Sequence, residues 1–318
     1  MIGFLYIVLL FLVLRFTVTL FNFLSNPKLG HYGRKFRDKI TIIISGNEGE
    51  CQELLDSIGL QDYENTEIII TGDRTADQVA FEAAGKYLVF LNKNAVVKKG
   101  LFNSMIYRMQ VFNLTMLSVI PNRVFVNLTD RVLAPLSEYL LINLLPLRLV
   151  RLFATPAFSA VNTTCIIFNA NIYKEHRWLA GVEDNGSIAF RLARTIKDKS
   201  LRTEILIANK LLYKQGGEST RAYSKQLCHA LELSAFGALA FIVFALVGPL
   251  VLLIEFDKAF FTLPLGLIFL TRVMISFLTG QNPFINLLLH PIQMISLTYL
   301  LIVATYQKLI IARKHMQE

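Results

Sequence analysis

A long apolar run at the start of the chain most constrains what it can fold into. The run extends from Ile2 to Leu24, and its only polar interruptions are Arg15, Thr17, Thr19 and Asn22. A helix needs about 20 apolar residues to cross a bilayer, so the run predicts a membrane-spanning helix. A cleavable signal peptide would show a basic start, a shorter apolar region and a small-residue cleavage site, none of which the sequence has. We therefore expect residues 1–25 to form a retained N-terminal anchor.

Three further apolar stretches lie near the other end of the chain, over Ala235 to Ile254, Phe260 to Leu278 and Leu287 to about Tyr306. Each is a candidate membrane span, so we expect a C-terminal membrane domain over 218–318. The composition agrees, because 54% of the residues are hydrophobic and only 17% are charged. These fractions are more hydrophobic and less charged than those of ordinary soluble globular proteins, as expected for a membrane protein.

Basic residues gather directly after the anchor, at Lys28, Arg34, Lys35, Arg37 and Lys39. Such clusters tend to stay on the cytosolic side of a span, so we expect a multi-pass protein of the inner or cell membrane whose central domain faces the cytosol. Three full C-terminal crossings would then place Lys308, Arg313 and Lys314 outside, against the same tendency. Either one C-terminal segment is re-entrant or interfacial, or the charge rule fails at this end.

The net charge of +9 raises the question of a nucleic-acid partner. The basic residues cluster beside membrane segments, and no signature of a nucleic-acid-binding module is present. Anionic lipid headgroups and substrate phosphates are therefore the expected partners, and nucleic acid is not. The three cysteines, Cys51, Cys165 and Cys228, show neither a pairing pattern nor metal-ligand spacing, which is consistent with a reducing compartment.

Between the membrane segments, residues 26–217 alternate short β-rich runs with amphipathic helical stretches. This pattern predicts one α/β domain with a largely parallel sheet. The predicted strands are Ile40 to Ile44, Glu67 to Thr71, Tyr87 to Leu91 and Met116 to Ile120. The predicted helices carry Leu54, Leu55 and Ile58, then cover Ala76 to Ala84, then carry Leu101, Met105 and Met109.

The stretch from Val132 to Phe153 is strongly apolar, but it also contains Pro135, Glu138, Pro146, Arg148 and Arg151, so we do not count it as a span. Two interpretations stay open. An amphipathic helix at the membrane surface would place its arginines among headgroups, and the alternative is a partly buried helix of the domain.

Polar residues follow the first two predicted strands. Ser45, Asn47 and Glu48 come after the first, and Gly72 and Asp73 after the second. Open α/β sheets bind ligands at the carboxyl ends of their strands, which makes these residues candidates for nucleotide binding. Polar residues at such places also serve as turn formers and helix caps.

The order of four short motifs resembles that of family 2 glycosyltransferases with the GT-A fold. The motifs are the Asn47-Glu48 loop, Glu67-Ile68-Ile69-Ile70 with its aspartate turn, Tyr87-Leu88-Val89-Phe90-Leu91 followed by Asn92-Lys93-Asn94, and Gly181-Val182-Glu183-Asp184. The third is in the place of the family's DXD motif, and the fourth is similar to its acidic ED motif. Together with the C-terminal membrane helices and Leu289-His290-Pro291, the chain resembles the membrane-bound enzymes associated with hopanoid and carotenoid glycosylation, over nearly its whole length.

The resemblance implies an α/β fold in which a GT-A nucleotide-sugar-binding (Rossmann-like) domain is flanked by one N-terminal and two to three C-terminal transmembrane helices. It also implies a set of donor-binding residues, which are Ser45, Asn47, Glu48, Asp73, Asn92, Lys93 and Asn94. Asp73 alone remains of the family's adjacent aspartate pair, because Gly72 occupies the first position. Asp73 either binds the base and ribose of the donor or only organises its turn.

The DXD motif of the family is degenerate here. In the family, two carboxylates and a divalent ion neutralise the diphosphate leaving group. The amides of Asn92 and Asn94 are weak ligands for a hard cation, and Lys93 repels one. We therefore assign no firm cofactor: a Mg²⁺ or Mn²⁺ site is implied by the resemblance but is weakened by the loss of the aspartates. Lys93 either contacts the diphosphate directly or is a solvated lysine in a turn.

The resemblance makes Asp184 the candidate catalytic base and Glu183 a residue that helps to position the acceptor. The alternative is an acidic pair that only interacts with a helix N-terminus. Arg221 and Lys225 are candidate diphosphate contacts, although a juxtamembrane basic cluster explains them as easily. Arg191 and Arg194 share a helix face, which is typical of a solvated surface as well as of an anion contact.

These observations and the resemblance predict transfer of a sugar from a nucleotide-sugar donor to a lipid-linked or membrane-embedded acceptor, and the resemblance implies inversion. The alternative is a catalytically silent homologue that serves as a scaffold or binding subunit in envelope-glycan assembly. Asn92, Asn94 and Gly72 favour the alternative, whereas Glu183 and Asp184 favour the enzyme. A transporter is a weaker interpretation, because the spans are few and most polar residues lie between them.

Overall fold

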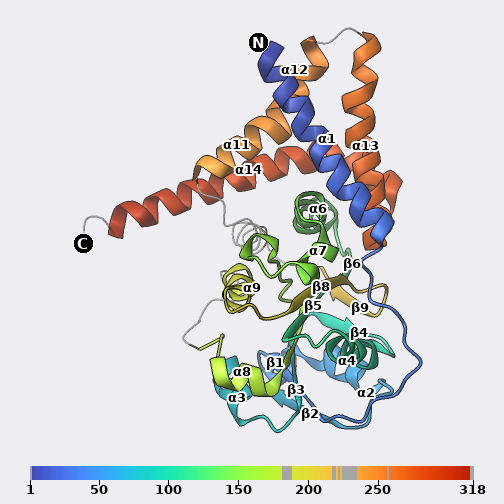
Figure 1. The fold of residues 1–318 in the computed structure, drawn as a ribbon, viewed down its shortest axis with the longest axis vertical. Helices are drawn as coiled ribbons and strands as arrows, with labels where there is room; N and C mark the ends of the chain where they lie inside the picture. Colours follow the sequence, from blue (N-terminus) through green and yellow to red (C-terminus); the bar gives the residue numbers. More distant parts are fainter. Residues whose placement is uncertain are drawn as a thin grey trace. The chain divides into compact units, whose positions relative to one another are not determined.

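The computed structural model describes residues 2–180, 188–216, 220, 223, 235–255 and 258–315. The chain divides into two compact units (Figure 1). The sheet unit contains Asn26–Val126 and Leu147–Gly216, and the helical unit contains Met1–Ser25, Asn127–Pro146 and Gly217–Glu318. Each unit is therefore assembled from separate stretches of the chain.

A six-stranded sheet forms the centre of the sheet unit. Its strands are β1 (Ile40–Ser45), β2 (Thr66–Ile70), β3 (Tyr87–Asn92), β5 (Met116–Ile120), β7 (Cys165–Asn169) and β8 (Thr203–Ile207). Their order is β2-β1-β3-β7-β5-β8, and only β7 runs antiparallel to its neighbours. The four predicted strands and the largely parallel sheet are confirmed, while β7 and β8 were not predicted.

Helices cover both faces of this sheet. Helices α2 (Gln52–Gly59) and α4 (Leu101–Val111) pack on one face, and α3 (Ala76–Glu82), α8 (Ala170–His176) and α9 (Ile188–Asp198) pack on the other. Successive strand residues point to opposite faces, so Ile42 belongs to one core and Ile43 to the other. A sheet covered on both sides needs apolar residues at nearly every strand position, which explains the continuous apolar runs.

A second, three-stranded sheet has the order β4-β9-β6. Its strands are β4 (Ala95–Val97), β9 (Leu212–Gln215) and β6 (Asn122–Val124). Strand β9 is antiparallel to β4 and parallel to β6. Strands this short carry too little periodicity to be predicted from sequence alone.

The stretch from Val132 to Phe153 is divided between the two units. It begins in α5 (Leu128–Leu133) and continues as α6 (Pro135–Leu144), both in the helical unit, and ends in α7 (Leu147–Leu152), in the sheet unit. Arg151 of α7 forms an ion pair with the buried Glu204 at 3.1 Å, and Arg148 lies 4.0 Å from the same carboxylate. The interpretation as a partly buried helix therefore holds for α7, whose arginines neutralise an internal carboxylate.

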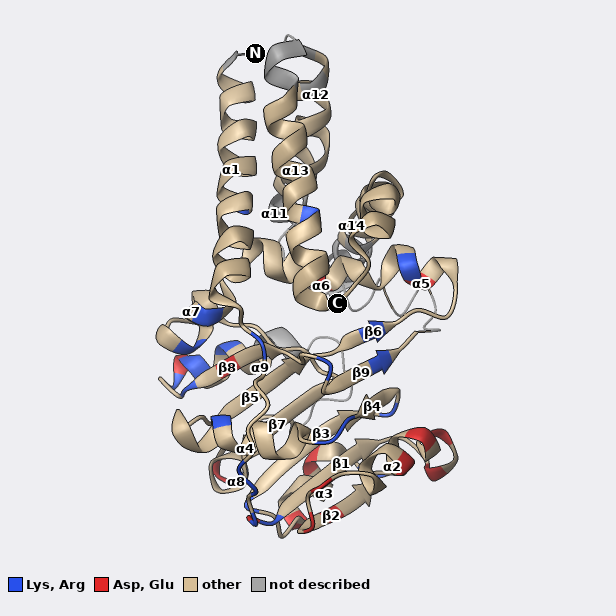
Figure 2. Cartoon of the chain, turned by 90° about the vertical axis from the view of Figure 1, so that its right-hand side faces the viewer, with Lys and Arg blue, Asp and Glu red and all other residues tan. Residues whose placement is uncertain are grey.

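The helical unit contains α1 (Ile2–Ser25), α13 (Lys258–Thr279) and α14 (Pro283–His315), each long and apolar enough to cross a membrane. The expected span Ala235 to Ile254 is divided into α11 (Ala235–Ile242), a π-helical turn η3 (Val243–Val247) and α12 (Gly248–Glu255). The longest apolar helix found in this region is shorter, Leu239–Leu252. Helix α14 crosses α1 and α13 at a steep angle instead of running alongside them (Figures 1 and 2).

Buried polar side chains connect the helices of this unit. Arg15 of α1 donates to the Asn143 side chain at 3.1 Å and to the Tyr139 hydroxyl at 3.0 Å, both on α6. Arg272 of α13, which is fully buried, donates to Gln293 of α14. Polar side chains inside an apolar helix bundle are costly unless they find such partners, so these contacts help to hold α1 to α6 and α13 to α14.

Candidate donor site

Three parallel strands bring the predicted donor-binding residues to one edge of the large sheet. Strand β1 lies between β2 and β3, and all three point the same way. Their register pairs Ile44 with Ile70 and Ser45 with Asn92, so the three strands end level with one another. The loops that follow β1, β2 and β3 therefore lie at the same sheet edge, where α/β sheets commonly bind ligands.

The loops after β1 and β2 are held together by hydrogen bonds that two backbone amides donate. The Gly46 amide donates to the Thr71 hydroxyl at 3.3 Å, and the Gly72 amide donates to the Gly46 carbonyl at 3.1 Å. Gly72 has φ +55°, a left-handed conformation that glycine adopts without strain. At the position where the resembled family has its first aspartate, this chain thus has a glycine whose amide bonds to the loop after β1.

Several predicted donor-binding side chains are exposed at this edge, namely Ser45, Asn47, Glu48 and Asp73. Asn47 precedes the 3-10 helix η1 (Glu48–Glu50) in an extended conformation, and its side chain makes no cap hydrogen bond there. These side chains are therefore accessible to a ligand.

The Asn92-Lys93-Asn94 turn follows β3. The Asn92 side-chain oxygen accepts from the Asn94 amide at 3.0 Å, so this side chain organises the turn. The Asn92 amide donates to the Thr164 carbonyl at 2.9 Å, and the Asn94 carbonyl accepts from the Gln215 amide at 3.0 Å. The turn is therefore fixed on both sides, by the start of β7 and by β9.

Lys93 of this turn forms an ion pair with Glu50 of η1. Its Nζ atom lies 2.6 Å from Oε2 of Glu50, with 40% of the lysine side chain and 52% of the glutamate side chain exposed. Glu50 was not among the predicted site residues, and 43 positions separate it from Lys93. The only sequence signal for it is its place in the loop that already contained Asn47 and Glu48.

The Asn92-Lys93-Asn94 turn carries no carboxylate that could bind a divalent cation. Nowhere in the described part of the chain do three or more His, Cys, Asp or Glu side chains form a group that could hold a metal ion. The turn after β3 offers two neutral amides and an ammonium, and the nearby Glu50 carboxylate is engaged by that ammonium.

Four predicted site residues, Glu183, Asp184, Arg221 and Lys225, lie outside the described residues. In α9, which follows Glu183 and Asp184 in the sequence, Arg194 is exposed. Within the basic and aromatic element, Tyr223 is described: it is buried, and its hydroxyl donates to the Asp130 carboxylate at 3.1 Å. Tyr223 is thus tied to α5 within the helical unit.

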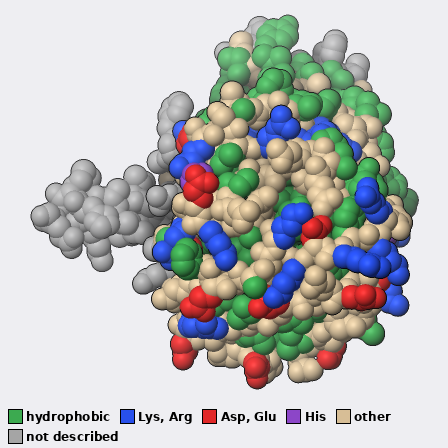
Figure 3. Space-filling view, turned by 60° about the horizontal axis from the view of Figure 1, so that its bottom comes forward, with side chains coloured by type: hydrophobic (Ala, Val, Ile, Leu, Met, Phe, Trp, Pro, Cys, Tyr) green, Lys and Arg blue, Asp and Glu red, His purple; other side chains and the backbone are tan. Residues whose placement is uncertain are grey.

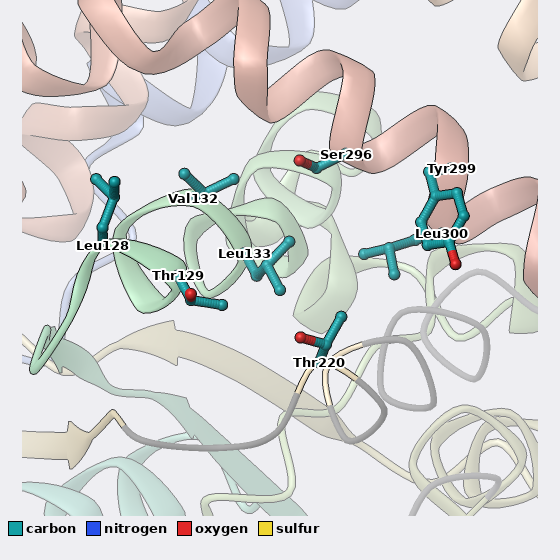
Figure 4. Close-up of a pocket in the computed structure, with 8 residues that line it drawn as sticks. All are labelled: Leu128, Thr129, Val132, Leu133, Thr220, Ser296, Tyr299 and Leu300. Carbon is teal, nitrogen blue, oxygen red and sulfur yellow. The ribbon is translucent and has the colours of Figure 1, made fainter.

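The helical unit has a cavity of its own, of about 330 Å³ (Figure 4). It lies between α5 and α14, next to Thr220. Apolar side chains and hydroxyl groups line it together: Leu128, Thr129, Val132, Leu133, Thr220, Ser296, Tyr299 and Leu300. The lining suits an apolar ligand that carries hydrogen-bonding groups.

Charges are distributed unevenly around the donor edge. Figure 2 shows acidic residues along the ribbon at and beside α2, and η1 and α2 contain Glu48, Glu50 and Glu53. On the face drawn in Figure 3, basic and acidic side chains are interspersed, without one continuous basic field. Any anion that approaches the β1 loop therefore meets local negative charge from these carboxylates.

The fold is known from a glycosyltransferase. The chain is similar in structure to the mannosyltransferase PcManGT from Pyrobaculum calidifontis, solved in complex with GDP-Man and Mn²⁺, with a TM-score of 0.51, 12% sequence identity, and coverage of 96% of this chain and 99% of that one. The GT-A fold predicted from the sequence is confirmed. No protein-family model and no curated protein matches the chain.

Two structures of S. aureus TarS 1-349 are also similar, one of them in complex with UDP-GlcNAc. Their TM-scores are 0.37 and 0.38, their sequence identities 13% and 11%, and they cover 74% and 75% of this chain and 81% and 86% of their own.

Proposed function

We propose that this protein transfers a sugar from a nucleotide-sugar donor to a hydroxyl group of a lipid-linked or membrane-embedded acceptor. The observation that carries the proposal is the shared edge of β2, β1 and β3 in a GT-A fold, because Asp73, Ser45 and Asn92 lie at or after the ends of these strands. The same chain carries three helices able to cross a membrane, which favours an acceptor that resides there.

The proposed reaction is a single displacement with inversion. Asp184 takes the proton of the acceptor hydroxyl while that oxygen forms a bond to the anomeric carbon of the sugar. The bond between this carbon and the donor diphosphate breaks at the same time, and the nucleoside diphosphate leaves with the electron pair. Glu183 helps to position the acceptor, and Asp73 contacts the base or ribose.

The cavity of the helical unit supports a lipid acceptor. Its apolar wall is formed by Leu128, Val132, Leu133 and Leu300, and its hydroxyl groups come from threonine, serine and tyrosine side chains. A volume of about 330 Å³ accommodates a portion of an acyl or isoprenoid chain. We propose that this cavity binds the apolar part of the acceptor.

We also propose that the sheet unit faces the cytosol, because basic residues follow α1. Helix α14 exposes an apolar stripe at helical spacing: Phe284, Leu288, Ile292, Ile295, Tyr299 and Ile302. If α14 lies along the membrane surface with this stripe among the acyl chains, Lys308, Arg313 and Lys314 remain cytosolic. Reporter fusions after Gly216 and after Glu318 are then both expected to give cytosolic signals, and an external signal at Gly216 would reverse the proposed orientation.

A silent homologue that acts as a scaffold or binding subunit in envelope-glycan assembly is the second candidate. Three observations favour it: Asn92 is engaged in its own turn, Lys93 is paired with Glu50, and Gly72 replaces a donor-binding aspartate. This candidate predicts lipid or partner binding without turnover.

Thermal stabilisation followed by turnover separates the two candidates. A panel of nucleotide sugars is added to the purified full-length protein, with EDTA and then with Mg²⁺ or Mn²⁺, and melting is followed by fluorescence. A ligand at 100 times its Kd stabilises the native state by about 2.7 kcal/mol. The stabilising donor is then incubated with membrane lipid extract. A glycosylated lipid supports the enzyme, whereas absence of product across a broad donor and acceptor panel favours the silent homologue.

A further inference from the structure

The Lys93–Glu50 ion pair lies over the end of strand β1. A Cβ atom built on Gly46 would come within 3.5 Å of both Oε2 of Glu50 and Cδ of Lys93. Gly46 itself has φ +138°, a conformation that side-chain-bearing residues rarely adopt. The two charged side chains therefore cover a glycine at the sheet edge where the donor site is proposed.

Nucleotide-sugar chemistry requires positive charge at this edge. The leaving diphosphate develops negative charge as its bond to the sugar breaks, and that charge needs a metal ion or a fixed cation close by. Among the described residues of the β3 turn, the only cation is Lys93, and the neighbouring amides are poor ligands for a divalent ion. A lysine ammonium can contact phosphate oxygens as a point charge.

Glu50 provides the anion that Lys93 contacts in the structure described here. Both side chains are partly exposed, so their ion pair is weak. The paired arrangement is favoured over the separated one by only about two- to fivefold. A diphosphate carries more negative charge than one carboxylate, and it can therefore displace Glu50 from the ammonium.

We propose that Lys93 binds the donor diphosphate in place of a divalent cation, and that Glu50 is the internal anion which the diphosphate displaces. The inference deepens the proposed function and rests on it. It assigns opposite effects to the two members of one ion pair: Lys93 favours diphosphate binding, and Glu50 competes with it.

The test is isothermal titration calorimetry of the full-length protein with GDP and with UDP, first in EDTA and then with Mn²⁺. We expect metal-free binding that Mn²⁺ does not strengthen. Lys93→Gln should weaken binding about 10- to 100-fold, as expected for loss of hydrogen bonds to a charged group, and Lys93→Arg should retain most of it. Glu50→Gln should strengthen binding about two- to fivefold.

Glu64→Gln is the matched control. It removes the same charge from an exposed position before β2, at the other end of that strand, and should leave binding unchanged. Melting curves of each variant exclude misfolding. Weaker binding in both Lys93→Gln and Glu50→Gln would identify a purely structural ion pair and overturn the inference.

The remaining outcomes separate the inference from the proposed function. Binding that strictly requires Mn²⁺ would overturn the role of Lys93 while leaving a nucleotide-sugar transferase in place. Absence of binding to either nucleotide, with or without Mn²⁺, would overturn the proposed function together with the inference.

Discussion

The buried carboxylate of Glu204 offers the sharpest test of how the sheet unit is stabilised. Its side chain is only 1% exposed, and Arg108 contacts it with two nitrogen atoms, one of them at 3.0 Å. Arg151 forms an ion pair with the same carboxylate at 3.1 Å. The ring of Phe112 lies against both guanidinium groups, 4.1 Å from that of Arg108 and 3.7 Å from that of Arg151. We predict that Glu204→Gln strongly destabilises this unit.

The magnitude follows from the burial of each partner. The Arg108 side chain is 9% exposed, so removal of the carboxylate charge leaves a buried cation uncompensated, at a cost of about 3–5 kcal/mol. The Arg151 side chain is 21% exposed, and its contribution is therefore less than about 1 kcal/mol. For a unit of this size the total corresponds to a decrease in Tm of roughly 6–24 °C.

Trp178 makes the assay specific for the sheet unit. It is the single tryptophan of the chain, and its ring stacks on Phe168 with a centroid distance of 5.9 Å. Thermal melting followed by tryptophan fluorescence therefore reports on the core around β7. Glu64→Gln, an exposed substitution expected to change stability by less than about 0.5 kcal/mol, is the control.

A Tm for Glu204→Gln within the scatter of the Glu64→Gln control would refute the reasoning, because it would mean that Arg108 needs no buried counter-charge. The double variant Glu204→Leu with Arg108→Met provides a second check. It removes both charges and should regain much of the lost stability, since apolar residues often replace a buried ion pair without net cost.

Three further predictions concern other residues. Burial lowers the pKa of Lys197 from 10.5 to about 8, so between pH 8 and pH 10.5 the unfolded chain binds more protons than the folded one. The free energy of unfolding, measured in denaturant melts and compared with that of Lys197→Met, should therefore rise with pH over this range. Gln293→Leu removes the acceptor of Arg272 in the helical unit and should cost about 1–3 kcal/mol, seen as a lower melting temperature of the helical circular dichroism signal. Asp184→Asn should reduce transfer by about 10² to 10⁴ while the Tm and nucleoside diphosphate binding stay unchanged; full activity would remove Asp184 as the base.

The sequence by itself determined the elements whose signal is local. The apolar runs at β1, β2 and β3, β-branched in the first two and partly aromatic in β3, and the apolar stretches of α1, α13 and α14 are long enough to be recognised within single windows. The parallel order of β1, β2 and β3 then places their following loops at one sheet edge. For that reason the location of the candidate donor site could be predicted from residues such as Asp73.

Tertiary structure alone decided which distant groups meet. Lys93 forms an ion pair with Glu50, 43 positions away in the sequence, and Arg108 forms one with Glu204, 96 positions away. Both contacts depend on strand register and helix packing, which no local pattern encodes. The chain also leaves the sheet unit between Val126 and Leu147 to build part of the helical unit. Apolar residues in that stretch satisfy a membrane-helix pattern and a core-helix pattern equally well, and only the neighbours on which they pack distinguish the two.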